Sequence, residues 1–332
     1  MRRTLLLLAA SLSLLAACSS SSDSGAQSPD TTPVTTTAVA PDTSAPPTTT
    51  AVTDLPTTTT AAAAPDPTRP YKVFVPTTYT KGTAMPLVVL LHGYGASGDI
   101  QEAYFQVEPL AEAKGFLYAH LDGTKNQRGD QFWNATDACC GFGTSVDDVA
   151  YVTAVIDDIS AKYDIDPKRI FLMGHSNGGF MSYRMACDKS DRIAAIASLA
   201  GATFADTKKC APSEPVSVLQ VHGTADGTIS YTGGIIPVVN GTYPGAEQSV
   251  ANWATYNGCS GSRTPSSPAL DFEPNISDAE TQRSAIDGCP DGIGVELMTV
   301  NGGAHIPGIV FPDGSHHLTE AMVDFLLAHP KP

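Results

Sequence analysis

Short apolar runs alternate with segments of helical period from about residue 70 to the end of the chain. The apolar runs, rich in aliphatic and β-branched residues, occupy residues 86–91, 116–120, 169–173, 192–199, 216–221 and 295–300. Apolar residues recur at intervals of three or four in residues 100–114, 147–163, 177–187, 246–256 and 318–328. Strands that alternate with helices are typical of α/β proteins. The pattern predicts a mostly parallel central sheet with helices on both faces.

A serine framed by glycines follows one of these apolar runs. The sequence Gly174-His175-Ser176-Asn177-Gly178 comes directly after the strand predicted at 169–173 and leads into the helix predicted at 177–187. Strand, tight turn and helix form the context of a nucleophile elbow, whose glycines permit the backbone angles that expose the serine hydroxyl. We therefore predict that Ser176 is a nucleophile.

Two further strand ends supply the partners that such a serine needs, a histidine base and an acid that orients it. In an α/β-hydrolase the acid and then the histidine follow the serine along the chain. Asp226 follows the apolar run 216–221, and His305 follows the run 295–300. Taken alone, Asp226 would be interpreted as a turn former and His305 as a loop residue. Their order after Ser176 predicts a catalytic triad.

The glycine-rich loop 92–98, after the first apolar run, is the candidate for part of an oxyanion hole. Such a hole stabilises a tetrahedral intermediate with backbone N–H groups. One donor is expected at Asn177, the residue after the nucleophile, and the other at Tyr94 in this loop. His92 and His222 precede glycines at strand ends and are interpreted as loop histidines with satisfied ring nitrogens.

Six motifs occur in one order along residues 70 to 330, namely LHGYGASG, WNATDACCG, VDDVAY, GHSNGGFMSYRMAC, VHGTAD and NGGAHIPG. This set resembles the secreted polyhydroxybutyrate depolymerase and feruloyl esterase family of α/β-hydrolases, including its actinobacterial lipoprotein esterases. The resemblance implies an α/β-hydrolase fold and places the family's serine, acid and histidine on Ser176, Asp226 and His305. The family commonly has a tryptophan just after the histidine, whereas here Ile306 leads into Pro307, which changes the expected lining of the acyl pocket.

The first 18 residues have the features of an export signal. Met1-Arg2-Arg3 precedes an apolar run from Leu5 to Leu15 that is too short to span a bilayer. Leu15-Ala16-Ala17-Cys18 resembles a bacterial lipobox, whose cysteine is lipidated. The alternative is an ordinary signal peptide that contains a cysteine. We expect residues 1–18 to be a lipoprotein signal peptide and the mature protein to be extracellular, anchored to the outer face of the membrane at Cys18.

Residues 19–69 differ in composition from the rest of the chain. They are almost entirely Ser, Thr, Ala, Pro and Asp, with scarcely a large apolar residue. Such a segment cannot bury enough surface to offset the entropy of ordering. We predict a disordered linker at 19–69 and one catalytic domain at 70–332, whose length suits a single α/β domain.

The chain has seven cysteines. Besides Cys18, the candidates for disulfides are Cys139, Cys140, Cys187, Cys210, Cys259 and Cys289. An even number in an exported chain favours disulfides, and six cysteines allow 15 pairings. We expect Cys259 to pair with Cys289, and the adjacent Cys139 and Cys140 to bridge to other segments. No zinc-type spacing occurs among the six, so no metal site is predicted.

The net charge of −15 at pH 7 argues against nucleic acid or an anionic membrane surface as a partner. Neutral esters fit better, either polyesters or esterified plant polysaccharides. His175, beside the nucleophile, and Trp133 are the candidate substrate contacts. Trp133 could stack on an acyl group or a polymer chain, and the alternative is a core aromatic beneath its loop.

These features predict an extracellular serine esterase that works through an acyl-enzyme, without a metal or organic cofactor. Its partners are an ester substrate and, through the lipid anchor alone, the membrane, and we expect a monomer. One alternative is a peptidase similar to prolyl oligopeptidase, since the same triad cleaves amides. Another is a surface binding protein that keeps the fold without turnover. Activity on p-nitrophenyl esters and labelling by a fluorophosphonate separate these possibilities.

Overall fold

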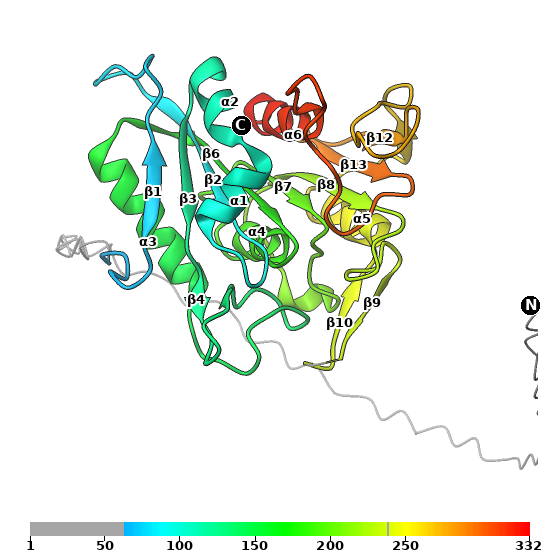
Figure 1. The fold of residues 1–332 in the computed structure, drawn as a ribbon, viewed down its shortest axis with the longest axis horizontal. Helices are drawn as coiled ribbons and strands as arrows, with labels where there is room; N and C mark the ends of the chain where they lie inside the picture. The colour runs from blue at the N-terminus through cyan, green and yellow to red at the C-terminus, as the bar shows by residue number, and fades with distance from the viewer. Residues whose placement is uncertain (1–62, 238) are drawn as a thin grey trace, which may run out of the picture. The chain divides into compact units, whose positions relative to one another are not determined.

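The computed structural model describes residues 63–237 and 239–332, and its main element is a nine-stranded sheet (Figure 1). The strands of this sheet are β1 (Tyr71–Phe74), β2 (Met85–Leu91), β3 (Leu117–Leu121), β6 (Ile165–His175), β7 (Ala195–Leu199), β8 (Ser217–Gly223), β11 (Arg263–Pro265), β12 (Thr281–Ile286) and β13 (Val295–Val300). Separate hairpins are formed by β4 (Thr124–Lys125) with β5 (Gln131–Phe132) and by β9 (Gly233–Ile236) with β10 (Gly241–Pro244). The helices are α1 (Gly98–Phe105), α2 (Val107–Lys114), α3 (Asp148–Lys162), α4 (Asn177–Asp188), α5 (Ala246–Tyr256), α6 (His317–Ala328) and a short 3-10 helix at Thr207–Lys209.

The strands of the sheet lie in the order β1-β3-β2-β6-β7-β8-β13-β12-β11. From β3 to β13 neighbouring strands are parallel. At the edges β1, β12 and β11 pair antiparallel. All six predicted apolar runs lie in the parallel part, so the predicted α/β fold is confirmed. The sequence does not predict the edge strands because β1 and β11 are very short, β12 is mostly polar, and none of them is buried on both faces.

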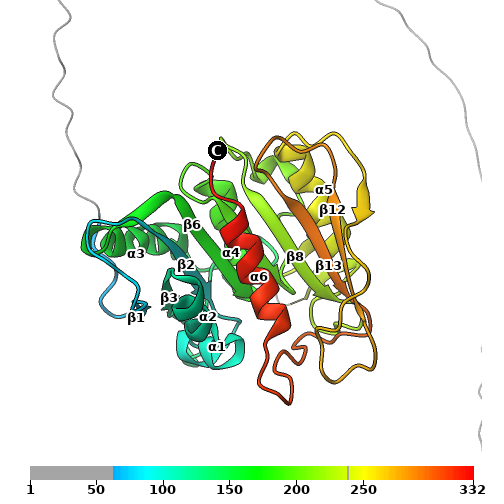
Figure 2. The ribbon, with the colours of Figure 1, turned by 90° about the horizontal axis from the view of Figure 1, so that it is seen from above.

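Two apolar cores pack on opposite faces of the sheet. Along β2, Leu87, Val89 and Leu91 join the core that includes side chains of α3, α4 and α5. Val88 and Leu90 join the core that includes side chains of α1, α2 and α6. Successive side chains of a strand point to opposite faces, so a continuous apolar run is buried on both sides. Figure 2 shows α1, α2 and α6 on one side of the sheet and α3, α4 and α5 on the other.

The helix predicted at 100–114 is in fact two helices. The break is at Gln106, which has a left-handed backbone (φ 53°) and donates its N–H to the carbonyl of Glu102 at 2.6 Å. Phe105 and Val107, on either side of the break, are both fully buried in the same core. Tertiary packing therefore overrides the helical tendency of this sequence.

Arg69 ties the start of the domain to its interior. Its side chain and that of Asp148 are 8% and 0% exposed, and the two groups form an ion pair at 2.6 Å. The guanidinium also lies 3.6 Å from the centre of the Tyr151 ring. Arg69, the last residue of the predicted linker, is thus packed against the domain.

The signal peptide predicted at 1–18, Cys18 and most of the linker predicted at 19–69 lie outside the described residues. Within the described part of the chain, every helix is too short or too polar to cross a membrane.

The disulfides within the described domain join three pairs of cysteines. Cys187 pairs with Cys210, and Cys259 pairs with Cys289 as predicted. The expectation that Cys139 and Cys140 bridge to other segments is wrong, because they pair with each other. The other four cysteines are occupied in their own pairs, which leaves these two neighbours as mutual partners.

Candidate active site

Ser176 stands at the turn between β6 and α4. Its backbone (φ 53°, ψ −119°) lies in a region that L-residues rarely adopt. The turn is held because the Ser176 N–H donates to the carbonyl of Leu199 at 2.8 Å. A side chain on Gly178 would collide with the carbonyl of Leu91, and one on Gly174 would collide with the backbone of Gly178. The glycine spacing of the motif is thus required by the close passage of α4 over β2.

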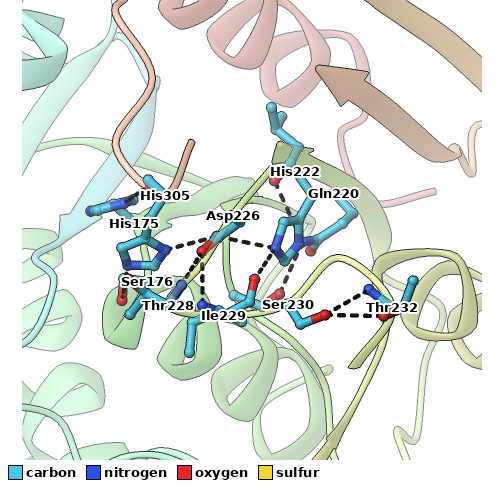
Figure 3. A network of polar contacts seen from close by, with 12 residues as sticks. His175, Ser176, Gln220, His222, Asp226, Thr228, Ile229, Ser230, Thr232 and His305 are labelled. Carbon is cyan, nitrogen blue, oxygen red and sulfur yellow. Dashed lines mark hydrogen bonds and ion pairs between the residues drawn. The ribbon is translucent and has the colours of Figure 1, made fainter. Parts of the chain in front are cut away.

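The structure brings together the three residues that the sequence predicts as a triad (Figure 3). His305 Nε2 lies 2.9 Å from the hydroxyl of Ser176. His305 Nδ1 lies 2.8 Å from Oδ2 of Asp226. Asp226 follows β8 and His305 follows β13, and parallel strands end at one edge of the sheet. Residues far apart in sequence therefore meet above β6.

Asp226 is a buried carboxylate with several donors. Its Oδ1 accepts the N–H groups of Thr228 and Ile229, each at 2.8 Å. Burial by itself would raise the pKa of Asp226, but hydrogen bonds from His222 and His305 and the N–H of Ile229 outweigh it and hold that pKa well below its usual range. The acid is therefore charged at neutral pH and can orient and stabilise a protonated His305.

His222 is a neighbour of the acid that the sequence interpretation leaves as a loop histidine. It is 1% exposed, and its Nε2 lies 3.3 Å from Oδ2 of Asp226. The spacing of four residues between His222 and Asp226 in the motif VHGTAD is the signal that could have indicated this contact.

The two expected oxyanion donors belong to residues near Ser176. Tyr94 and Ser176 line one cavity, and Asn177 is the first residue of α4. Among the described residues, neither the Tyr94 nor the Asn177 N–H has a hydrogen-bond partner. Free backbone N–H groups beside a nucleophile and at a helix N-terminus are suited to bind a developing oxyanion.

The loop that carries Tyr94 is fixed by three contacts. The side chain of Gln101 accepts the N–H of Gly93 at 2.9 Å, and the carbonyl of Gln131 accepts the N–H of Gly95 at 2.8 Å. The indole Nε1–H of Trp133 donates to the carbonyl of His92 at 3.0 Å. The position of this loop therefore depends on both α1 and β5.

Trp133 is a core aromatic, which corrects its prediction as a substrate contact. Its side chain is 0% exposed. Its backbone N–H donates to Oδ1 of Asn177 at 2.7 Å, and its carbonyl accepts from Nδ2 at 2.9 Å. Trp133 lies beneath the loop, where its two N–H groups donate to Asn177 and to the carbonyl of His92. It thereby supports the residues of both expected oxyanion donors.

A cavity of about 400 Å³ opens beside Ser176. It is lined by Gly93, Tyr94, Ala96, Ile100, Gln101, Tyr104, His175, Ser176, Thr228, His305 and Ile306. Ile100 and Ile306 are 60% and 63% exposed, so the mouth of the cavity is apolar. An acyl group of modest size and low polarity would fit such a lining.

His175 lines this cavity, but its ring is engaged with the protein. Its Nε2 lies 2.8 Å from the carbonyl of His305. Burial lowers the pKa of His175 to about 4, with a further contribution from His305. The ring is therefore neutral at pH 7 and donates to that carbonyl, which holds the His305 loop against the elbow.

Comparison with known proteins gives one consistent family. Residues 70–247 match the family model described as Esterase PHB depolymerase. The chain is 34% identical over 239 residues to feruloyl esterase B of Piromyces equi, a match that covers 70% of this chain and 42% of that protein. It is 25% identical over 257 residues to feruloyl esterase D of Neurospora crassa, covering 72% of this chain and 74% of that protein.

Among solved structures, the acetyl xylan esterase from Aspergillus awamori has the same fold. The superposition has a TM-score of 0.52 and 16% sequence identity, and it covers 77% of this chain and 93% of that one. At this identity the likeness concerns the fold alone.

Proposed function

Since the chain belongs to the esterase PHB depolymerase family, we propose that it hydrolyses carboxylic esters with Ser176 as nucleophile, His305 as general base and acid, and Asp226 as the group that orients His305. The observation that carries this proposal is the row of contacts from Ser176 Oγ to His305 Nε2 at 2.9 Å and from His305 Nδ1 to Asp226 at 2.8 Å. It lies at an elbow near the N–H groups of Tyr94 and Asn177, for which the described part of the chain supplies no hydrogen-bond partner.

The proposed reaction has two halves. Ser176 Oγ attacks the ester carbonyl while its proton passes to His305 Nε2, and the N–H groups of Tyr94 and Asn177 stabilise the oxyanion. The C–O bond to the alcohol breaks, and the alcohol leaves with the proton from His305. Water then attacks the acyl-enzyme by the same route and releases the acid and free Ser176. Asp226 stays ionised throughout and stabilises the imidazolium.

The proposed substrate is a neutral ester, either a hydroxyalkanoate polyester or a feruloyl or acetyl ester of a polysaccharide. The description of the family supports a polyester, and the name of the relative from Piromyces equi supports a feruloyl ester. Initial rates on polyhydroxybutyrate film, methyl ferulate and short p-nitrophenyl esters would rank them. The apolar lining around Ile100 and Ile306 leads us to expect turnover of short and medium p-nitrophenyl acyl esters.

We place the proposed enzyme outside the cell, anchored through Cys18. The disulfides of the described domain support an oxidising compartment, since disulfides are rare in the cytosol. Metabolic labelling with a fatty-acid probe should mark the protein, and Cys18→Ser should remove the label.

The nucleophile is tested by Ser176→Ala. We expect the rate on p-nitrophenyl butyrate to fall by at least about ten-thousandfold, because no other group replaces the attacking oxygen. Labelling by a fluorophosphonate should be lost and the melting temperature kept. Ser266→Ala, at an exposed serine after β11, is the matched control and should leave the rate unchanged. Near-normal turnover by Ser176→Ala would refute the proposed mechanism.

A further inference from the structure

A second histidine contacts the carboxylate that faces His305. His222 is the penultimate residue of β8 and is almost completely buried. Its Nε2 lies 2.8 Å from the carbonyl oxygen of Ile229 and 3.3 Å from Oδ2 of Asp226. The same Oδ2 is 2.8 Å from His305 Nδ1, so one carboxylate oxygen lies between two imidazoles (Figure 3).

The partners of His222 determine which ring nitrogen carries its proton. The hydroxyl of Tyr183 donates to Oε1 of Gln220 at 2.8 Å. The amide nitrogen of Gln220 therefore points the other way, toward the carbonyl of Gly201 at 2.9 Å and toward His222 Nδ1 at 3.0 Å. An amide nitrogen can only donate, so Nδ1 must accept. A neutral His222 then has its proton on Nε2, where it faces Asp226 and Ile229.

These contacts connect helix α4 to the loop that carries Asp226. Tyr183 lies on α4, the helix that begins directly after Ser176, and it fixes Gln220 on β8. Gln220 fixes the tautomer of His222, and the Nε2–H of His222 lies against both ends of the loop from Asp226 to Ile229. The loop itself holds Asp226 through the N–H groups of Thr228 and Ile229. The orientation of Asp226 therefore depends, through His222 and Gln220, on α4, the helix that begins directly after Ser176.

We propose that His222 is a positioning residue of the catalytic site, which donates from Nε2 to the Asp226 loop and keeps Oδ2 aimed at His305. This inference rests on the proposed function of Ser176, Asp226 and His305. His222 does not touch the substrate or the reacting atoms; it acts through Asp226. Without its donor, the carboxylate can rotate or shift by a fraction of an ångström, and misplacement of this order is enough to slow a triad.

The test compares two amide replacements of similar polarity. In His222→Gln the amide reaches the place of Nε2, whereas in His222→Asn it reaches only the place of Nδ1. We expect His222→Gln to keep kcat on p-nitrophenyl butyrate within about threefold, and His222→Asn to lower kcat by about 10²-fold with little change in KM. His317→Asn, an exposed histidine at the start of α6, is the control. Equal kcat values for the two His222 variants would overturn the proposal.

A double-mutant cycle adds a second readout. If His222 acts through Asp226, the loss caused by His222→Asn should largely disappear in an Asp226→Asn background. If the kcat of the double variant is lowered by the product of the two single losses, His222 acts independently of Asp226, and the proposal is wrong.

A measurement on the unmodified protein keeps the proposal testable if a variant does not fold. Long-range 1H–15N NMR spectra should show a neutral His222 with its proton on Nε2. A proton on Nδ1 would overturn the inference. This outcome is independent of the Ser176→Ala result, so failure of the proposed esterase function and failure of the role of His222 can be told apart.

Discussion

At the residue scale, four histidines lie near one edge of the sheet, and they differ in exposure and in hydrogen-bond partners. His305 is partly exposed and lies between Ser176 and Asp226. His92 is fully buried, with Nδ1 2.7 Å from the carbonyl of Gly93 and Nε2 accepting a backbone N–H. His175 and His222 are also buried and bonded. Burial and partners, which are properties of the environment, separate the candidate base from the structural rings.

Two of these buried rings, His92 and His175, should make stability depend on pH. Burial lowers the pKa of His92 and of His175 to about 4 from the ordinary value of 6.5. As pH falls below 6.5, the unfolded chain binds protons that the folded chain does not, so the free energy of unfolding decreases until about pH 4. Each histidine contributes up to about 3 kcal/mol across this range.

Urea unfolding at pH 7.0 and pH 4.5 measures this effect. We expect lower stability at pH 4.5 and a smaller difference between the two pH values in His92→Asn, which has no ring to protonate. An identical difference in the variant would contradict the assignment of this effect to His92.

At the element scale, the decisive feature is the tight junction from β6 to α4. Only the second half of β6, from Ile170 to His175, is buried, and α4 begins immediately after Ser176. The helix therefore lies so close to β2 that a Cβ at position 178 would meet the carbonyls of Leu91 and His92. Glycine is needed here because backbone atoms cannot move aside as a flexible side chain can.

We expect Gly178→Ala to destabilise the protein and to lower its activity. The added methyl group forces α4 away from β2, at a cost of about 1–3 kcal/mol, and displaces Ser176 with the elbow. Chemical unfolding measures the first effect and p-nitrophenyl butyrate hydrolysis the second. Gly227→Ala, where an added Cβ meets nothing within 4 Å, is the stability control. Equal stability of the two variants would contradict the argument.

At the scale of the whole molecule, the domain is closed by contacts between distant segments. The disulfides Cys187–Cys210 and Cys259–Cys289 span 23 and 30 residues. The ion pair of Arg69 with Asp148 joins the first residues of the domain to the start of α3. Burial raises the pKa of Asp148, and Arg69 opposes that rise. Each of these buried charges is therefore stabilised by the other.

We expect Arg69→Ala to destabilise the domain strongly. Removal of the cation leaves Asp148 buried without its counter-ion, and breaking a buried pair in this way costs about 3–5 kcal/mol. The control is Lys72→Ala, which removes an exposed pair with Asp99 and should change the melting temperature little. Similar melting temperatures for Arg69→Ala and Lys72→Ala would show that the pair does not hold the domain.

The sequence by itself determined the local features of this protein. Apolar runs and helical period indicated the parallel strands, and the glycine spacing around Ser176 indicated the elbow, because both depend on neighbouring residues. The sequence also indicated that Ser176, Asp226 and His305 meet, because each follows a predicted parallel strand and parallel strands end at one edge of the sheet.

Tertiary structure decided the surroundings and partners of individual side chains. It placed Trp133 in the core, paired Cys139 with Cys140, broke the helix at Gln106 and set His222 against Asp226. These outcomes follow from which surfaces meet in the folded domain. Burial and most hydrogen-bond partners of these residues come from other strands and loops, so a local pattern such as the four-residue spacing of His222 and Asp226 can suggest a contact without fixing it.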